Sequence, residues 1–359
     1  HFNYSTRNNS TLVYNNFKFY FMNSSLVITT INSPNQNIRL FSKGCKKNKW
    51  NLVIIGDKKS PKTFKINYGT YFSYEQQLNL ELSFAKICPV NNYARKNIGY
   101  LISMKTNKDF IIETDDDNAP KKNYFNKIKL SHKTEEIKND TWVNIYDLFK
   151  KNEKYKIWPR GIPLDEIFKN KIKIKKNKSL KNFYLQQGVA ENNPDVDAIF
   201  RLIYEKIDVK FKNYKISLGS AKSTLNSQNT IWHKSIFELM YLPSTCTMRC
   251  TDIWRSIIAF NILKKNDLGI LIYGTTMYQK RNYHNLMNDF NLEMPMYLNS
   301  KKFNEILENI KIKKGLSFFS YNLLHIYKIL IKKGFFQKRE LIYLKSWLKD
   351  CKNIKNNLG

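Results

Sequence analysis

Apolar runs that alternate with segments of helical spacing constrain the fold of this chain more than any other feature. The segment 93–109 has Ile98, Leu101 and Ile102 at helical spacing, and it leads directly into an apolar run. Strands that alternate with helices predict a mostly parallel sheet, and strands buried on both faces are continuously apolar. We therefore predict an α/β fold with a mostly parallel central sheet. The apolar runs are SLVITTINSPN (25–35), KWNLVIIGDKKSPKTF (49–64) and FIIE (110–113).

The chain divides into three predicted parts. Residues 1–24 are polar and are expected to be disordered or ragged, and residues 25–295 form the α/β domain. Residues 296–359 form a helical C-terminal extension, because Leu323, Ile326 and neighbouring apolar residues follow helical spacing. A hydrophobic content of 42% suffices for a sizeable core.

Apolar runs and cysteine usage bear on the cellular compartment of the protein. No window approaches the roughly 18 uninterrupted apolar residues of a membrane span. The five cysteines are scattered, which favours a reduced compartment and hence the cytoplasm. The chain begins with His1 instead of Met, so the Golgi lumen stays open as an alternative if an N-terminal anchor was trimmed.

The net charge of +32 suits a nucleic-acid-binding protein at first sight. Most of the excess is Lys, however, and it accompanies abundant Asn and Ile, a combination that adenine- and thymine-rich coding sequence produces without functional demand. The lysine-rich run NKIKIKKNKSLK (170–181) is expected to be a solvated linker. We therefore predict no specific nucleic-acid partner, and a general attraction for ligands that carry phosphate.

Three adjacent carboxylates, Asp115, Asp116 and Asp117, follow one apolar strand, and Asp57 follows another. Ligands of open α/β sheets bind beyond the carboxyl ends of the strands. Because neighbouring carboxylates repel one another, a divalent cation such as Mn²⁺ or Mg²⁺ would explain the cluster. The alternative is an Asp-rich turn or a helix N-terminus. An Asp-rich motif in this position is the arrangement of nucleotide-sugar glycosyltransferases with the GT-A fold.

Longer motifs carry a resemblance to a known family. These motifs are VITTINSPN (27–35), VIIGDKKSPK (53–62), NYARKNIGYL (92–101), ETDDDN (113–118), WPRGIPLDEI (158–167), NPDVDAIFRL (193–202), TDIWRS (251–256) and YQKRNYHNLMNDF (278–290). Through them the chain resembles the STELLO glycosyltransferases and, more distantly, the reversibly glycosylated polypeptides that include UDP-arabinopyranose mutases. The resemblance covers about residues 25–295.

The resemblance implies a metal-dependent enzyme that moves a sugar from a nucleotide donor, UDP-linked, to a glycan or protein acceptor. Two alternatives remain at this point: a UDP-sugar mutase or self-glycosylating protein, and a non-catalytic partner that associates with other glycosyltransferases. A basic nucleic-acid-binding module comes last.

The resemblance also assigns roles around the acidic cluster. Asp115 and Asp117 are expected to ligate the metal, and Asp116 to bind the nucleotide sugar beside them. Thr29 belongs to the same nucleotide-sugar set, and Asp57 is expected to hold the nucleoside through uracil or ribose.

Four basic residues are candidates for the diphosphate. Arg95 and Lys96 precede a helix and could meet phosphate, where an exposed helix start is the alternative. Arg281 and His284 could close over the diphosphate, and His284 could complete the metal shell; a purely structural histidine is the alternative.

Two further residues are catalytic candidates. Arg160 aligns with the arginine-containing loop to which the reversibly glycosylated polypeptides attach their sugar, although it could instead bind phosphate. Asp252 is the candidate general base for the acceptor hydroxyl, against a helix start as the alternative. Asp195 and Asp197 are candidates for binding sugar hydroxyls, with helix capping as the alternative.

Overall fold

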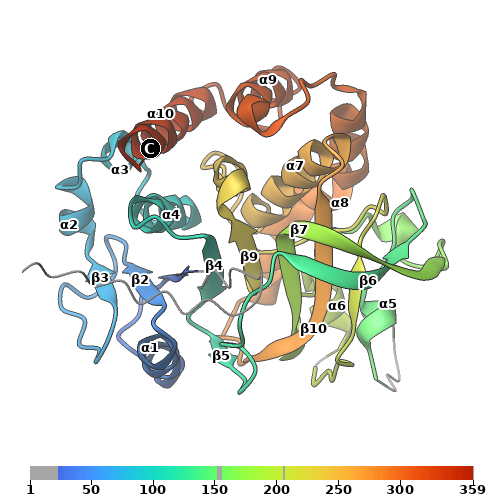
Figure 1. The fold of residues 1–359 in the computed structure, drawn as a ribbon, viewed down its shortest axis with the longest axis horizontal. Helices are drawn as coiled ribbons and strands as arrows, with labels where there is room; N and C mark the ends of the chain where they lie inside the picture. The colour runs from blue at the N-terminus through green and yellow to red at the C-terminus, as the bar shows by residue number, and fades with distance from the viewer. Residues whose placement is uncertain (1–22, 152–155, 205–206, 359) are drawn as a thin grey trace, which may run out of the picture.

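A ten-stranded mixed sheet forms the centre of the molecule (Figure 1). The computed structural model describes residues 23–151, 156–204 and 207–358, so residues 1–22 of the segment predicted to be disordered lie outside it. The strand order is β3-β2-β1-β4-β9-β7-β6-β8-β10-β5, and β7 also pairs with β10. The α/β class is therefore confirmed.

The first half of the sheet is parallel, as predicted. Strand β1 pairs in parallel with β2 and β4, and β2 pairs in parallel with β3. Thr29 lies opposite both Ile55 and Asp115, so the carboxyl ends of the three central strands lie at one level. The bounds are Ser24–Thr29 for β1, Asn51–Ile55 for β2, Thr70–Phe72 for β3 and Phe110–Asp115 for β4.

The prediction of a mostly parallel sheet is wrong for the second half. Antiparallel pairs join β4 to β9, β9 to β7, β7 to β6, and β10 to both β5 and β8. Parallel pairs also occur in this half, β6 with β8 and β7 with β10. Parallel neighbours need a crossover connection, and this half instead includes the short helices Tyr146–Phe149 (α5), between β6 and β7, and Ala198–Ile203 (α6), between β7 and β8, which do not form a regular alternation of strands and crossover helices. The bounds of the strands are Asn118–Pro120 (β5), Ser131–Ile137 (β6), Ile174–Asn192 (β7), Lys215–Ser217 (β8), Thr230–His233 (β9) and Gly269–Gln279 (β10).

The lysine-rich run 170–181 is not a linker, and that prediction is wrong. From Ile174 onward it is the first half of β7, which pairs with β6 from Ile137 to Ser131. The side chains of residues 175–182 are exposed. Backbone hydrogen bonds to β6 thus hold this part of β7, while its lysine side chains remain exposed to water. The sequence of the run lacks the alternation of apolar and polar residues from which a half-buried strand is predicted, so the strand was missed.

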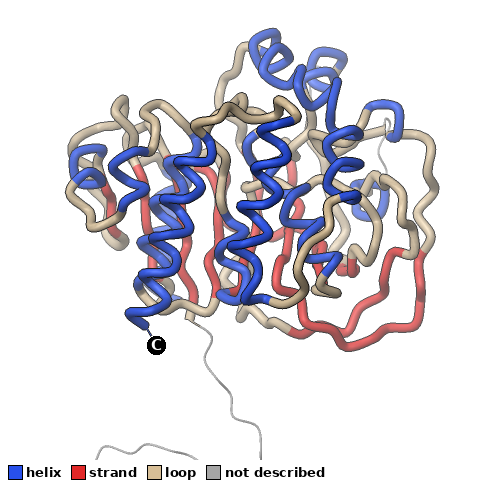
Figure 2. Tube along the Cα trace, turned by 90° about the horizontal axis from the view of Figure 1, so that it is seen from above, coloured by secondary structure: helices blue, strands red, loops and turns tan. Residues whose placement is uncertain are grey.

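Helices cover both faces of the sheet. Helix α1 lies on one side, and α4, α7, α9 and α10 lie on the other (Figures 1 and 2). Gly99 of α4 allows close approach, because a Cβ there would meet Val27 Cγ1 at 2.5 Å. The longer helices are Gln36–Asn48 (α1), Lys96–Lys105 (α4), Thr251–Lys265 (α7), Leu286–Asn309 (α8), Phe319–Lys332 (α9) and Glu340–Leu358 (α10), with short helices Tyr74–Leu78 (α2) and Ser83–Ile87 (α3).

The C-terminal helices share the core of the sheet. Leu323 of α9 and Trp347 of α10 are buried in the same apolar cluster as Val27 of β1 and Ile98 of α4. The helical spacing predicted after residue 295 is confirmed, and α8 runs without interruption through Pro295. None of the described helices has the length and apolar character of a membrane span.

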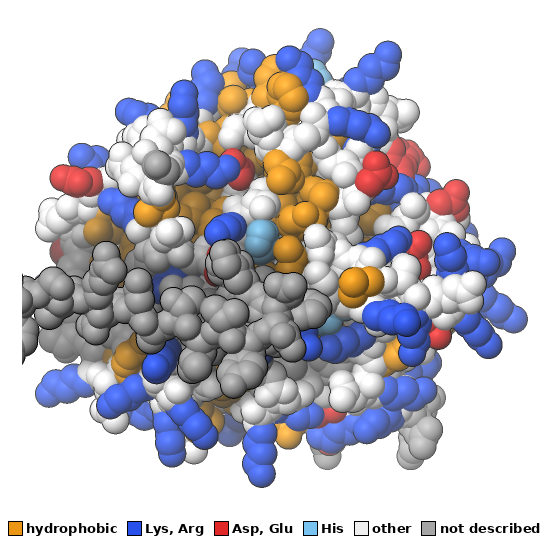
Figure 3. Space-filling view, viewed as in Figure 1, with side chains coloured by type: hydrophobic (Ala, Val, Ile, Leu, Met, Phe, Trp, Pro, Cys, Tyr) orange, Lys and Arg blue, Asp and Glu red, His pale blue; other side chains and the backbone are white. Residues whose placement is uncertain are grey.

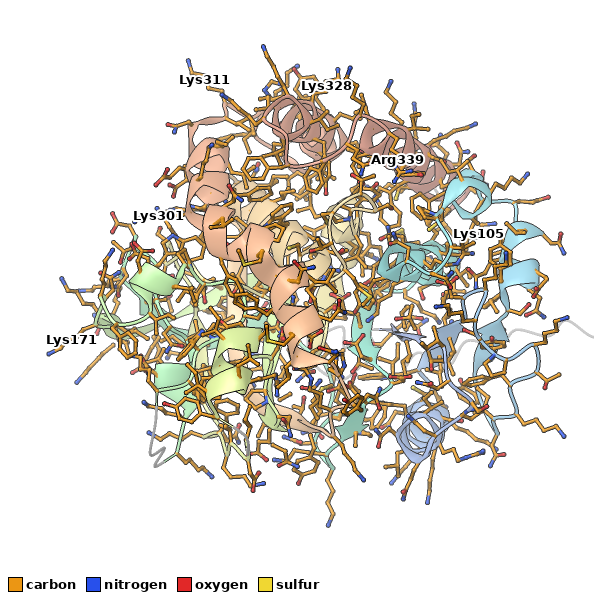
Figure 4. All side chains as sticks on the ribbon, turned by 180° about the vertical axis from the view of Figure 1, so that it is seen from behind. Lys105, Lys171, Lys301, Lys311, Lys328 and Arg339 are labelled. Carbon is orange, nitrogen blue, oxygen red and sulfur yellow. The ribbon has the colours of Figure 1, made fainter. Side chains whose placement is uncertain are left out.

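The positive charge is spread widely over the surface. In the part of the face in Figure 3 that is not grey, lysines and arginines are scattered, mainly around the rim, with few acidic side chains between them. The labelled side chains in Figure 4 point outward from several different helices and loops: Lys105, Lys171, Lys301, Lys311, Lys328 and Arg339. The net charge is therefore not concentrated at one element.

Candidate active site

A cleft of about 890 Å³ opens beyond the carboxyl ends of β1, β2 and β4. Its position follows from the register of these strands, which brings the loops after them to one edge of the sheet. Lys96 and Asp197 lie outside its lining, whereas the other predicted site residues line it: Thr29, Asp57, Arg95, Asp115, Asp116, Asp117, Arg160, Asp195, Asp252, Arg281 and His284.

Asp115 is the last residue of β4, and one of its two carboxylate oxygens is hydrogen-bonded within the protein. This oxygen, Oδ1, accepts hydrogen bonds from Lys96 Nζ at 2.7 Å and from Tyr93 Oη at 2.8 Å. Lys96 is fully buried, contrary to the alternative of an exposed helix start. Among the described residues, Asp115 Oδ2 has no hydrogen-bond donor, and the side chain lines the cleft.

Asp116 holds the loop after β1. Its Oδ2 accepts from Thr30 Oγ1 at 2.6 Å and from Asn32 Nδ2 at 3.0 Å. Its backbone carbonyl accepts from Asn35 Nδ2 at 2.8 Å. Since these bonds occupy Asp116 within the protein, the middle aspartate shapes the cleft wall.

Asp117 differs from both neighbours. Its Oδ2 accepts from Gln279 Nε2 at 2.9 Å, while its Oδ1 is buried and has no partner among the described residues. Burial, and secondly the charge of Asp115, raises the pKa of the Asp117 carboxyl to about 7. A buried carboxylate oxygen without a hydrogen-bond donor is costly, and a second carboxylate nearby adds repulsion. A bound cation, or a hydrogen-bond donor of a bound ligand, would satisfy this oxygen.

A divalent ion would thus be held by the outer two aspartates, Asp115 and Asp117. The described residues contain no group of three or more His, Cys, Asp or Glu side chains arranged to hold a metal. Besides His284, which stays a predicted ligand and lines the cleft, further ligands to such an ion would come from a bound substrate or from water.

Asp57 and Arg95 are built into the floor of the cleft. The Asp57 carboxylate accepts from the backbone N–H groups of Asn91 at 2.9 Å and Asn92 at 3.0 Å. Arg95 is 1% exposed and donates through Nε to Gln77 Oε1 at 3.0 Å. Both side chains therefore hold the loop before α4, and the alternative of an exposed helix start is wrong for Arg95 as well.

Arg160 lies between two carboxylates. Its Nε and Nη2 each donate to Asp195 at 2.9 Å, and Nη1 and Nη2 donate to Asp252 at 3.2 and 3.0 Å. Nη1 also donates to the backbone carbonyl of Arg249. All five N–H groups are bound. Gly161, at φ +88°, allows this turn, because a Cβ there would meet a side chain of α7 at 2.4 Å.

This arrangement bears on the roles predicted for Arg160 and Asp195. Attachment of a sugar to Arg160, or binding of phosphate by it, requires a free N–H, and each one donates within the protein. The two carboxylates raise the pKa of the Arg160 guanidinium further above its usual range against the opposing effect of burial. In this structure Arg160 and Asp195 are therefore bound to each other and to neighbouring residues, and the roles predicted for them stay predictions.

A chain of hydrogen bonds links this group to the acidic cluster. Asp252, in the first turn of α7, accepts from Ser227 N at 3.2 Å and from Ser227 Oγ at 3.3 Å. Ser227 Oγ in turn lies 2.5 Å from Tyr93 Oη, which donates to Asp115. Burial and Asp115 raise the pKa of the Tyr93 hydroxyl well above its ordinary value, so it remains a donor.

The segment after β10 carries Arg281 and His284, and both lie against Asp289 of α8. Arg281 Nη2 and the Asp289 carboxylate form an ion pair at 2.5 Å, and His284 Nδ1 lies 3.3 Å from the same carboxylate. His284 therefore faces Asp289 through Nδ1, while both basic side chains also line the cleft.

Asp197 is the N-cap of α6, which was the alternative to its sugar-binding role. Its Oδ1 accepts from Phe200 N at 2.8 Å, and its Oδ2 accepts from Trp158 Nε1 at 2.6 Å. It is fully buried and contributes to the fold outside the cleft.

Several residues of the site were not identified from the sequence. Tyr93 and Gln279 lie within motifs that carried the family resemblance, so their position beside predicted site residues could have identified them. Ser227 lies 134 residues from Tyr93 along the chain and outside every quoted motif. Arg249 lines the cleft, and its Nε donates to Glu293 Oε1 at 2.8 Å.

The fold and the cleft define an α/β protein whose carboxylates gather at the strand ends. A family model described as STELLO glycosyltransferases matches residues 249–358. The chain is 22% identical over 350 residues to the probable glycosyltransferase STELLO2 of Arabidopsis thaliana, covering 90% of this chain and 44% of that relative. It is 24% identical over 322 residues to the probable glycosyltransferase STELLO1 of the same plant, covering 84% and 41%.

These matches confirm the resemblance to the STELLO glycosyltransferases. The chain spans less than half the length of the curated relatives that it matches. The more distant similarity to reversibly glycosylated polypeptides stays a prediction, as do the individual roles of the cleft residues.

Proposed function

We propose that this chain is a glycosyltransferase domain that binds a UDP-linked sugar in the cleft together with Mn²⁺ or Mg²⁺. The observation that carries the proposal is the buried Oδ1 of Asp117, which has no partner among the described residues, in the same cleft as Asp115, whose hydrogen bonds to described residues all reach Oδ1. Both relatives bear the name of probable glycosyltransferases, which supports the same class of reaction.

Asp115 and Asp117 would hold the cation in this proposal. A bound divalent ion would neutralise the charge that develops as the nucleotide diphosphate leaves. Arg249 and Arg281 line the same cleft and present guanidinium groups to the diphosphate. Lys96 fixes the first aspartate through its 2.7 Å contact, so that the two carboxylates keep their relative position.

Asp252 is the proposed general base for the acceptor hydroxyl. Asp252 Oδ2 accepts from Arg160 Nη2 at 3.0 Å, whereas the two contacts from Ser227 to the same oxygen are longer, at 3.2 and 3.3 Å, so an acceptor hydroxyl would take the place of a Ser227 contact. A base must reach the proton that it removes, and Asp252 lines the cleft that would hold the donor.

The proposal is tested by thermal unfolding with a panel of nucleotide sugars, each with and without Mn²⁺. A ligand at about 100 times its dissociation constant should stabilise the fold by about 2.7 kcal/mol. We expect UDP-linked sugars to produce this shift only with Mn²⁺. Absence of a metal-dependent shift with every nucleotide sugar would overturn the proposal.

The role of Asp252 needs a separate measurement. Asp252→Asn should retain Mn²⁺-dependent UDP binding and lose release of the sugar from the donor that binds best. Unchanged sugar release in this variant would remove Asp252 from the reaction.

A further inference from the structure

The C-terminal helix α10 carries two buried carboxylates that face different loops. Glu340 and Asp350 are 0% and 3% exposed. Glu340 accepts from three groups of the loop 241–245, whereas Asp350 accepts from the first two residues of α3. Helix α10 lies beside α3 and α4, apart from the acidic cluster (Figure 1).

Glu340 binds the start of the segment that leads into the cleft. Its Oε1 accepts from Tyr241 Oη at 2.5 Å and from Ser244 N at 3.0 Å, and its Oε2 accepts from Thr245 N at 2.7 Å. The Gln337 N–H, just before α10, donates to Thr245 Oγ1 at 3.1 Å. Asn97 holds the middle of the same loop through two bonds to the backbone of Leu242, so Glu340 is the anchor of the backbone N–H groups of Ser244 and Thr245.

The anchored loop reaches both sides of the cleft. The backbone carbonyl of Ser244 accepts from Asn92 Nδ2 at 3.1 Å, and the Asn92 N–H donates to Asp57. Four residues after Thr245 comes Arg249, which lines the cleft. The segment from Ser244 to Arg249 is thus held at its start by Glu340 and at its end by the bond from Arg160 to the Arg249 carbonyl.

We propose that Glu340 is a positioning residue for ligand binding: it sets the place of Arg249, and through the loop that of Asp252, without touching ligand. Loss of its charge weakens the bonds to the backbone N–H groups of Ser244 and Thr245, while the bonds from Asn92, Gln337 and Arg160 to the segment remain. The binding part of this inference rests on the function proposed above. The structural part, that Glu340 orders residues 244–249, does not.

Asp350 provides a matched control. It is on the same helix, is equally buried, and also accepts from two backbone N–H groups, those of Ser83 at 3.0 Å and Phe84 at 2.8 Å. These donors belong to α3 and not to the segment 244–249. Glu340→Gln and Asp350→Asn each remove one charge and keep the shape of the side chain, so their general effects on stability should be similar.

The experiment compares both variants of the full chain in two measurements. First, amide hydrogen exchange without ligand should rise at least about tenfold across residues 244–249 in Glu340→Gln, and should stay unchanged there in Asp350→Asn. Second, the affinity for UDP with Mn²⁺ should fall by about tenfold in Glu340→Gln alone, since small displacements of positioning groups have effects of this size or larger.

The outcomes separate this inference from the proposed function. Unchanged exchange across 244–249 in Glu340→Gln, or an equal rise in both variants, overturns the positioning role. So does a selective rise in exchange with wild-type affinity for UDP and Mn²⁺. If the wild-type chain binds no UDP with Mn²⁺, the proposed function fails, and the exchange measurement still decides whether Glu340 orders the segment.

Discussion

Replacement of Arg160 by Lys tests whether this guanidinium belongs to the structure of the cleft or to its chemistry. The side chain is 6% exposed, and its partners Asp195 and Asp252 are 11% and 6% exposed. An ammonium group has three N–H donors against the five that Arg160 uses, so at least two bonds are lost. A hydrogen bond to a charged group contributes about 1.5–3 kcal/mol, which gives an expected loss of about 3–6 kcal/mol.

The loss is measured as the free energy of unfolding in urea, with mass spectrometry of the wild-type chain for sugar bound at Arg160. Lys169→Met serves as the control, because Lys169 is 53% exposed and its ion pairs with Asp165 and Glu166 are screened by water, so the free energy of unfolding should hardly change. We expect no sugar on Arg160 after incubation with UDP-linked sugars and Mn²⁺. A loss below about 1 kcal/mol in Arg160→Lys would refute the reasoning, and sugar on Arg160 would restore the self-glycosylating alternative.

Two further predictions concern buried acids. Burial raises the pKa of Asp197 to about 6 from its ordinary value of 3.8, so the folded protein keeps this carboxyl protonated at a pH where the unfolded chain loses the proton. The resulting contribution to stability is full below about pH 4 and is lost as the pH rises through 6. Asparagine does not titrate, so the free energy of unfolding of Asp197→Asn minus that of wild type should increase by up to about 3 kcal/mol from pH 4 to pH 8, and a difference that stays constant with pH would contradict the raised pKa. Arg255→Met should lose about 3–5 kcal/mol, because it leaves the fully buried Glu113 without its bidentate partner at 2.8 and 2.9 Å. Adding Glu113→Gln should recover part of that loss in urea unfolding, and additive losses would show that the pair is not coupled.

The sequence predicted those parts of the molecule that local patterns determine. The strands that end at Thr29 and Asp115 are continuous apolar runs followed by polar loops, and their parallel register places the acidic cluster on the cleft. The mixed second half was not predicted, because the direction of a strand depends on its connection and on its partner. The run from Lys175 to Lys181 shows this, since its backbone pairs with β6 although its side chains have no buried face.

The state of each candidate side chain depends on distant partners, which no local pattern contains. Arg160 meets one carboxylate 35 residues away and another 92 residues away, which accept four of its N–H groups, and the backbone carbonyl of Arg249 accepts the fifth. Asp57 follows a strand, as a ligand-binding acid would, but it accepts from backbone N–H groups of the loop before α4. In contrast, Asp117 keeps an oxygen without a partner among the described residues, and this could be seen only once Gln279 was placed beside it.

The most direct test of the proposed function is the binding of UDP with and without Mn²⁺ to the double variant Asp115→Asn and Asp117→Asn. The control is Asp208→Asn, which removes a carboxylate that is 73% exposed and lies outside the cleft lining. We predict that the wild type and the control bind UDP only with Mn²⁺, and that the double variant does not bind it. Without ligand, the double variant should be less stable than wild type, because Asp115→Asn leaves the fully buried Lys96 without its charged partner at 2.7 Å, so binding is measured below the unfolding temperature of the variant. Undiminished, Mn²⁺-dependent binding of UDP by the double variant would show that the two aspartates are structural, and would contradict the proposed function.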